Sequence, residues 1–333
     1  MKKMLLLCVL LLLSMPLIAQ ESDSDEPEQI YAPYVYMARY PVIQLATTAE
    51  ETGIRYFSLA FILSGVECDA RWSGTVPIEE SFISNLLISD LEALRELGGD
   101  VIISFGGWSG VDLAERCEDV DSLVEQYQRV IDVYGVTRLD FDIEGDDINN
   151  PETLARRLEA IAQLQENNRE MGHELIISFT LPVRPTGLTE EGIYVIEEAR
   201  DAGVDIDIVN IMTMNFGEGF PSDEMGENTI QAAESLVSQL QEIYPDVETD
   251  DLWGQVGITP MVGINDRQSE IFQLEDAQMV LEFAEQQGIR VITIWSLDRD
   301  IQCEWVDALA NDCSGIQQDP FAFSAIFNTI LDE

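Results

Sequence analysis

Histidine and lysine are nearly absent from this sequence of 333 residues. The one histidine is His173, so neither a Ser-His-Asp triad nor a multi-histidine zinc site is expected. The two lysines, Lys2 and Lys3, precede an apolar run, and no lysine follows them. The sequence also lacks a cofactor motif and a spaced calcium loop. We therefore expect neither a cofactor nor a bound metal.

Basic residues of any kind are few. Lys and Arg number 17 against 63 Asp and Glu, which gives a formal net charge of −46. A nucleic-acid-binding protein needs a basic surface to displace counterions from phosphate, and an anionic membrane attracts the same kind of surface. The charge therefore disfavours both nucleic acid and an anionic membrane surface as partners. We also expect a monomer. The acidity itself has two interpretations: a heavily solvated surface that stays soluble, or adaptation to high salt.

Residues 1–19 have the pattern of a secretory signal peptide. The two lysines are followed by an apolar run over 4–13, then by Pro16 and by small residues near Ala19. This run is too short for a membrane span. The acidic, polar segment over 20–30 is typical of a linker. These features predict a secreted protein, extracellular or periplasmic, without a membrane segment after cleavage.

Four cysteines remain after this leader, and an even number in a secreted chain predicts two disulfides. Four cysteines allow three pairings. A Cys303–Cys313 bridge would close a short local loop, which leaves Cys68–Cys117 as the longer link.

Short β-rich apolar runs alternate with amphipathic helical patterns along 31–333, without a second linker. One helical pattern covers 151–171, with Asn150 as its cap, and two others end at Gly203 and Gly288. This alternation predicts a single α/β domain, a (β/α)8 TIM barrel. An open doubly wound sheet would need a glycine-rich loop after the first strand, and none is present. The expected strands cover residues 34–37, 55–63, 101–107, 138–145, 175–182, 206–214, 256–262 and 291–297.

The fourth expected strand carries three acids. Side chains on a strand alternate between its faces, so Asp140, Asp142 and Glu144 share one face, and Phe141 and Ile143 share the other. In a barrel the acids then line the interior and rise toward the carboxyl end, where barrel enzymes place their chemistry. Coupling between like charges should raise the pKa of at least one of them, and a carboxyl that stays protonated near neutral pH suits a general acid.

With these motifs in place, the sequence resembles glycoside hydrolase family 18, the chitinases and their relatives, over nearly all of 31–333. Ser104-Phe105-Gly106-Gly107 is similar to the S-x-G-G motif, and Asp140 to Glu144 are similar to the D-x-D-x-E motif. Met212-Thr213-Met214-Asn215 resembles the sixth-strand motif, and Trp295 resembles the tryptophan that floors the sugar site. The residues around these motifs resemble those of a bacterial secreted chitinase subgroup.

The resemblance implies retaining, substrate-assisted hydrolysis of chitin or N-acetylglucosamine oligosaccharides. Glu144 would be the acid and base, Asp142 would orient the acetamido group, and Asp140 would share a proton with Asp142. Two departures stand out: Thr137 replaces the first motif acid, and Met214 replaces a tyrosine. An endo-β-N-acetylglucosaminidase acting on N-glycans or peptidoglycan-like chains is an alternative, as is a non-catalytic sugar-binding protein.

Further residues are expected to line the substrate cleft. Trp108 follows the two glycines directly, and the glycines allow the backbone to approach the substrate or the fourth strand. An aromatic face packs on the apolar face of a sugar ring, which favours Trp295 as a platform. The full set of expected substrate-binding residues is Trp295, Met212, Met214, Asn215, Tyr36, Gly106, Gly107 and Trp108. Asp146 and Asp147, after the catalytic strand, are expected to be solvated acids.

Overall fold

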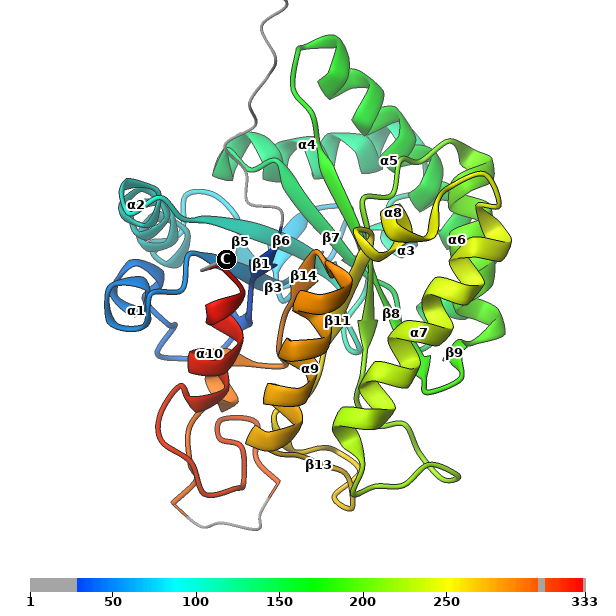
Figure 1. Ribbon diagram of the computed structural model, residues 1–333. Helices are drawn as coiled ribbons and strands as arrows, with labels where there is room; N and C mark the ends of the chain where they lie inside the picture. The colour runs from blue at the N-terminus through cyan, green and yellow to red at the C-terminus, as the bar shows by residue number, and fades with distance from the viewer. Residues whose placement is uncertain (1–28, 305–308, 332–333) are drawn as a thin grey trace, which may run out of the picture.

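The structure is a computed structural model that describes residues 29–304 and 309–331 (Figure 1). The expected signal peptide over 1–19, and all but the last two residues of the expected linker over 20–30, lie outside the described residues. Within the described ranges, no helix has both the length and the apolar character needed to cross a membrane.

Parallel strands form the centre of the molecule and confirm the expected (β/α)8 barrel. Each barrel strand pairs in parallel with the next barrel strand along the chain, from β2 to β14. The first barrel strand consists of two parts, β1 and β2. Because β1 pairs with β14, the last barrel strand, and β2 pairs with β3, the second, the first strand closes the ring. The barrel strands are β1 (Ile30–Tyr31), β2 (Tyr34–Tyr36), β3 (Tyr56–Ser64), β6 (Asp100–Gly106), β7 (Arg138–Asp142), β8 (Ile176–Arg184), β10 (Ile208–Met212), β11 (Val256–Thr259) and β14 (Val291–Ile292).

Helices surround this barrel (Figure 1). The expected helix ends are present: the Asn150 side chain accepts a hydrogen bond from the Thr153 N–H, and Gly203 and Gly288 end their helices in the left-handed conformation. The helices are α1 (Leu45–Thr52), α2 (Phe82–Glu96), α3 (Leu113–Arg116), α4 (Val120–Tyr134), α5 (Pro151–Glu170), α6 (Glu190–Ala202), α7 (Met225–Ile243), α8 (Thr249–Trp253), α9 (Leu274–Gln287) and α10 (Ala322–Phe327).

Short elements follow several barrel strands at their carboxyl ends. The antiparallel additions are β4 (Ala70–Trp72), β5 (Val76–Pro77), β9 (Gly187–Leu188), β12 (Gly263–Ile264) and β13 (Ile271–Phe272). Single turns of 3-10 helix, η1 (Asp147–Asn149) and η2 (Leu297–Arg299), follow β7 and β14 in the same way, whereas a third, η3 (Asn328–Leu331), follows α10 and contacts β1.

Several strands end earlier than their apolar runs predict. The run over 138–145 contributes β7 only as far as Asp142, and the run over 291–297 contributes β14 only as far as Ile292. Ile143 and Ile294 lie beyond these strand ends and are still buried. An apolar run marks the residues that are buried. Burial therefore continues past the last residues that pair with a neighbouring strand, and the run is longer than the strand.

Aromatic side chains on the outer faces of the strands form a large part of the core. Phe105 stacks on Phe141 with ring centroids 5.2 Å apart, and Tyr127 from α4 packs edge-on against both rings. Because Phe141 faces the helices, its neighbours Asp140 and Asp142 face the interior of the barrel, as the alternation predicts.

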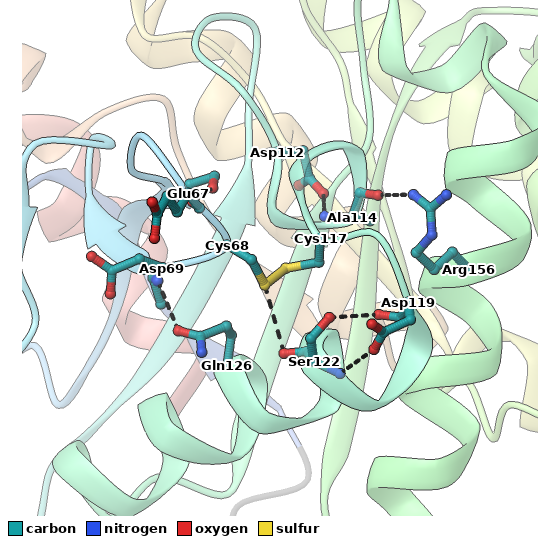
Figure 2. The surroundings of a disulfide bond; sticks show 12 residues. Glu67, Cys68, Asp69, Asp112, Ala114, Cys117, Asp119, Ser122, Gln126 and Arg156 are labelled. Carbon is teal, nitrogen blue, oxygen red and sulfur yellow. Dashed lines mark hydrogen bonds between the residues drawn. A yellow bond between two sulfur atoms is a disulfide. The ribbon is translucent and has the colours of Figure 1, made fainter.

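Both predicted disulfides are present. Cys68–Cys117 joins the loop after β3 to the segment between α3 and α4, and Cys303–Cys313 closes the short loop. Figure 2 shows the first bridge beside the start of α4, where the Asp119 side chain caps the helix by accepting from the Ser122 N–H. Gln126 of α4 accepts a hydrogen bond from the Ala70 N–H, so the bridge and this bond together fasten β4 to α4.

Candidate active site

Asp140 is the innermost of the three acids and is held by four hydroxyl groups. Its Oδ2 accepts hydrogen bonds from Tyr34 at 2.8 Å and Ser104 at 2.6 Å. Its Oδ1 accepts from Ser178 at 2.9 Å and Thr180 at 2.7 Å. Burial raises the pKa of Asp140, and these four donors oppose the rise by favouring the ionised form.

Asp142 lies above Asp140 and has a different environment. Its side chain is 5% exposed, and its Oδ1 has no hydrogen-bond partner within the part of the chain that the structure describes. Burial, with the charges of Glu144 and Asp140 added to it, raises the pKa of Asp142 well above its ordinary value. Of the two carboxyls, Asp140 is therefore the one that has hydroxyl donors to stabilise a negative charge.

Glu144 follows the end of β7 and is partly exposed. Burial raises its pKa to about 7, a hydrogen bond from the Trp108 backbone lowers it, and the charge of Asp266 raises it. The sequence predicted a raised pKa from like-charge coupling. The direction is confirmed, but burial is the largest cause. At pH below about 7 this carboxyl keeps its proton and meets the requirement for a general acid.

Gly106 and Gly107 allow the third and fourth strands to approach closely at the site. Both have positive φ, +96° and +90°. A Cβ on Gly106 would lie 2.2 Å from the carbonyl oxygen of Asp142, and one on Gly107 would lie 2.7 Å from the Phe61 ring. The predicted close approach to the fourth strand is present, and it brings the Trp108 backbone to Glu144.

Trp295 lies after β14, across the barrel from β7, among aromatic side chains. Its ring stacks on Phe61 with centroids 5.7 Å apart, and Tyr34 and Tyr36 pack against it at 5.8 and 6.3 Å. Tyr36 is 38% exposed, so its ring extends this cluster toward solvent. The structure thus brings Tyr36 and Trp295 together. No pattern in the sequence singles out Phe61, which lies in an apolar run like many core residues.

The last residue of β10 and the segment after it hold the remaining expected binding residues. Met212 is buried and Met214 is half-buried. Asn215 donates its side-chain amide to Asp266 at 3.2 Å and accepts a hydrogen bond from the Arg267 N–H at 3.0 Å. Asn215 therefore links this segment to the loop whose Asp266 acts on the pKa of Glu144.

The sequence did not predict a chain of hydrogen-bonded polar side chains that crosses the barrel interior. Tyr34 contacts Thr180, and Thr180 accepts from the Asn210 amide at 2.8 Å. Asn210 in turn accepts from Thr259 at 2.9 Å. These residues fix the orientation of the donors around Asp140. Thr137, the departure from the family motif, is exposed before the start of β7 and is not among the partners of Asp140.

A buried arginine joins the two loops that meet at Glu144. Arg157 of α5 is 1% exposed and forms ion pairs with Asp112, at 3.0 Å, and with Asp147. Asp112 ends the loop that carries Trp108, and Asp147 lies in the turn after Glu144. Asp147 is therefore not the solvated acid that the sequence suggested, because its counter-ion comes from a helix that follows it in the chain.

We expect Arg157→Leu to lower the free energy of unfolding by about 3–5 kcal/mol, because two carboxylates would lose their buried counter-ion. Arg169→Leu is the matched control on the same helix. Its partners Glu166 and Asp205 are exposed, and exposed pairs contribute only about 0–1 kcal/mol. Denaturant unfolding of both variants measures the difference, and equal losses would contradict a structural role for the buried pair.

Comparison with known proteins gives one consistent family. The sequence model of the glycosyl hydrolases family 18 matches residues 84–251. The crystal structure of the catalytic domain of a hyperthermophilic chitinase from Pyrococcus furiosus superposes with a TM-score of 0.82 at 35% identity, covering 92% of this chain and 96% of that one. Catalytic-site mutants of active domain 2 of a thermostable chitinase from the same organism, complexed with chito-oligosaccharides, are 36% identical, with a TM-score of 0.81 and coverage of 92% and 95%.

Two curated proteins are similar over most of this chain. The probable bifunctional chitinase/lysozyme of Escherichia coli K12 is 34% identical over 313 residues, 90% of this chain and 34% of that protein. Endochitinase 11 of Metarhizium anisopliae is 35% identical over 283 residues, 83% of this chain and 53% of that protein. The chain thus spans about a third and about half of the lengths of these relatives.

Proposed function

Because this chain belongs to the glycosyl hydrolases family 18 and is a chitinase-like glycoside hydrolase, we propose that it cleaves β-1,4-linked N-acetylglucosamine polymers by substrate-assisted catalysis. The carboxyl column of Asp140, Asp142 and Glu144 is the observation that carries the proposal. Burial raises the pKa of its outermost member to about 7, and one oxygen of its middle member accepts no hydrogen bond from the described residues.

In the first step Glu144 donates its proton to the glycosidic oxygen, and the bond between that oxygen and the anomeric carbon breaks. The 2-acetamido oxygen of the substrate attacks the anomeric carbon and forms an oxazolinium ion. Asp142 orients the acetamido group, and Asp140 shares a proton with Asp142. In the second step the Glu144 carboxylate takes a proton from water, whose oxygen opens the oxazolinium ring with net retention.

Only a sugar with an N-acetyl group at the cleavage position supplies this nucleophile, so the mechanism itself selects the substrate class. Trp295 forms the floor under that sugar, with Tyr36 at its edge. Met212, Met214 and Asn215 line the wall that faces the acetamido group. Asn215 offers an amide at the position where the family's tyrosine and aspartate motif would supply polar groups.

The leader over 1–19 and the two disulfides support secretion, in keeping with a bacterial secreted chitinase, because disulfides persist outside the reducing cytosol. We propose a monomeric enzyme that meets its polymer outside the cell.

Cleavage of peptidoglycan-like chains is a second candidate, favoured by the name of the bifunctional chitinase/lysozyme to which the chain is similar. These chains also carry N-acetylated sugars, so the same carboxyl column would act on them.

Mass spectrometry of the products from N-acetylglucosamine hexamer, at low and at high salt, tests the proposal. Shorter acetylated oligomers are expected. Activity in high salt alone would also favour a salt-adapted surface over simple solvation. If the hexamer binds and stays intact in both salts, the protein is a sugar-binding member of its family. If it neither binds nor reacts while peptidoglycan fragments are cleaved, the second candidate is correct.

The pH profile gives a further prediction. We expect kcat/KM to fall as pH rises through about 7, because Glu144 must be protonated to act as an acid. Asp266→Asn should move this alkaline limb to lower pH, since removal of a negative charge lets Glu144 ionise more easily. Initial rates between pH 4 and 9 measure both. Asp223→Asn, at an exposed position, is the control, and an unshifted limb in Asp266→Asn would refute the electrostatic role.

A further inference from the structure

A short hairpin after β11 contacts the segment that follows β10. Its strands are β12 and β13, which pair in antiparallel register, and residues 265–270 form its turn. Within the turn the Asn265 N–H donates to the Glu270 carbonyl at 3.0 Å, and the Glu270 N–H donates to the Arg267 carbonyl at 2.7 Å. These bonds close the turn, so a contact made by one of its residues also fixes the position of the others.

Glu270 is the buried acid of this turn. The residue is 4% exposed, and its two carboxylate oxygens accept hydrogen bonds from two successive backbone N–H groups after β10, those of Phe216 and Gly217, each at 2.8 Å. Gly217 has a positive φ of +92°, which favours glycine. Successive N–H groups in such a turn form a concavity that binds an anion. A carboxylate therefore suits this position, and an amide side chain would keep only one of the two acceptor oxygens.

Asn215, the residue before these two N–H groups, is held by the same turn. Its N–H donates to the Asn265 side chain at 3.3 Å, and its side-chain amide donates to Asp266 at 3.2 Å. Asn215 has a φ of +53°, a conformation that is uncommon for a residue with a side chain. The contacts with the turn thus hold Asn215 in this conformation and connect it to Asp266.

The other side of the hairpin is fixed to the loop after β14. Arg299 of η2 is 1% exposed and donates to the carbonyls of Val262 and Ile264 at 3.1 and 2.6 Å. The Ile264 N–H donates to the Ser314 carbonyl at 2.7 Å. The hairpin therefore connects the loops after β10 and β14, and Glu270 provides two of the hydrogen bonds on the β10 side.

We propose that Glu270 is a positioning residue for the hydrolysis: through the Phe216 and Gly217 N–H groups it holds Asn215 in place, together with the Asp266 that Asn215 binds. Glu270 acts on the backbone and not on the substrate. This inference rests on the proposed function, because it takes Glu144 as the acid on which the charge of Asp266 acts. It implies that loss of Glu270 changes the pH dependence of the reaction, and not only the amount of folded enzyme.

The test measures the alkaline limb of kcat/KM for N-acetylglucosamine hexamer between pH 4 and 9. The groups that act on Glu144 are Asp266 from the hairpin, Asp142 from its own segment and the Trp108 backbone. In Glu270→Ala the turn is released from the segment after β10, so the charge of Asp266 acts less on Glu144 and the limb should move to lower pH. At the pH optimum we expect kcat/KM to fall by up to about 10²-fold, the effect of a displacement of about 1 Å in a site.

Two further variants distinguish positioning from a general loss of structure. Asp266→Asn alone should move the limb in the same direction, and Glu270→Ala in that background should move it no further, because both changes remove one interaction. Glu270→Gln keeps the shape and one acceptor oxygen, so its rate and its limb should lie between those of the wild type and Glu270→Ala. Glu275→Ala, at an exposed position in the first turn of α9, is the matched control.

A smaller amount of folded protein lowers the rate at every pH and leaves the limb in place. A limb at the wild-type pH in both Glu270 variants would therefore overturn the inference, as would a shift that adds fully to that of Asp266→Asn. Both results leave the proposed function intact, because the wild type still cleaves the hexamer. Thermal unfolding shows which variants fold, and if Glu270→Ala does not, the limb of Glu270→Gln decides. If the wild type cleaves no hexamer, the proposed function fails first and this inference fails with it.

Discussion

Glu144→Gln is expected to lower turnover of N-acetylglucosamine hexamer by at least about 10²–10⁴-fold, the contribution of a positioned general acid, while the hexamer still binds. Glutamine has the shape of the protonated glutamic acid but has no proton to transfer to the leaving oxygen. Product analysis by mass spectrometry measures turnover, and calorimetric titration of the variant measures binding. More than a few per cent of residual turnover would refute the role of Glu144.

The stability of the same variant gives an independent reading. The fold raises the pKa of Glu144 from 4.5 to about 7, so its protonated form is favoured by the folded state and its ionised form costs stability above that pH. The glutamine has no ionised form, so Tm at pH 8 should equal or exceed that of the wild type. Glu170→Gln, at an exposed position at the end of α5, should change neither turnover nor Tm. A variant with low Tm would point to misfolding as the cause of lost activity.

The column of acids could be predicted from the sequence because its signal is local. Strict alternation of Asp140, Asp142 and Glu144 with apolar residues determines the face of each side chain once the strand is recognised. The barrel followed from the alternation of strand and helix patterns, and the two disulfides followed from parity and loop length. The acids and the barrel thus depend on neighbouring residues or on a regular repeat, and the disulfides depend on the number of cysteines in the chain.

The rest of the site depends on contacts between distant segments. Tyr34 reaches Asp140 across 106 positions in the sequence, and Asp266 acts on Glu144 from a loop after β11. Asp147 looked like a solvated acid because its partner Arg157 is recognised only when the turn folds onto α5. The spacing of residues in the sequence does not indicate such contacts between distant segments.

The donor set around Asp140 explains why the neighbouring carboxyl is poised for its role. Four hydroxyls stabilise a charge on Asp140, and none within the described residues reaches Oδ1 of Asp142. A substrate acetamido group would therefore meet a carboxyl whose free oxygen is available and whose charge can develop as its proton moves toward Asp140. The negative charge would form next to the positive oxazolinium ion, where stabilisation of the transition state has its greatest effect.

Asp142→Asn is accordingly expected to lower kcat by about 10²–10³-fold, in the range found for loss of a preorganised electrostatic group, with little change in Tm. Asparagine keeps the shape and can still hold the acetamido group, but it cannot supply the negative charge. Because burial disfavours the ionised form of Asp142, a neutral asparagine at this position adds no cost to folding. Steady-state kinetics on the hexamer and thermal unfolding measure the two effects, with Asp246→Asn at an exposed position as the control. A rate near that of the wild type would show that orientation alone suffices, and the charge at Asp142 would then have no part in forming the oxazolinium ion.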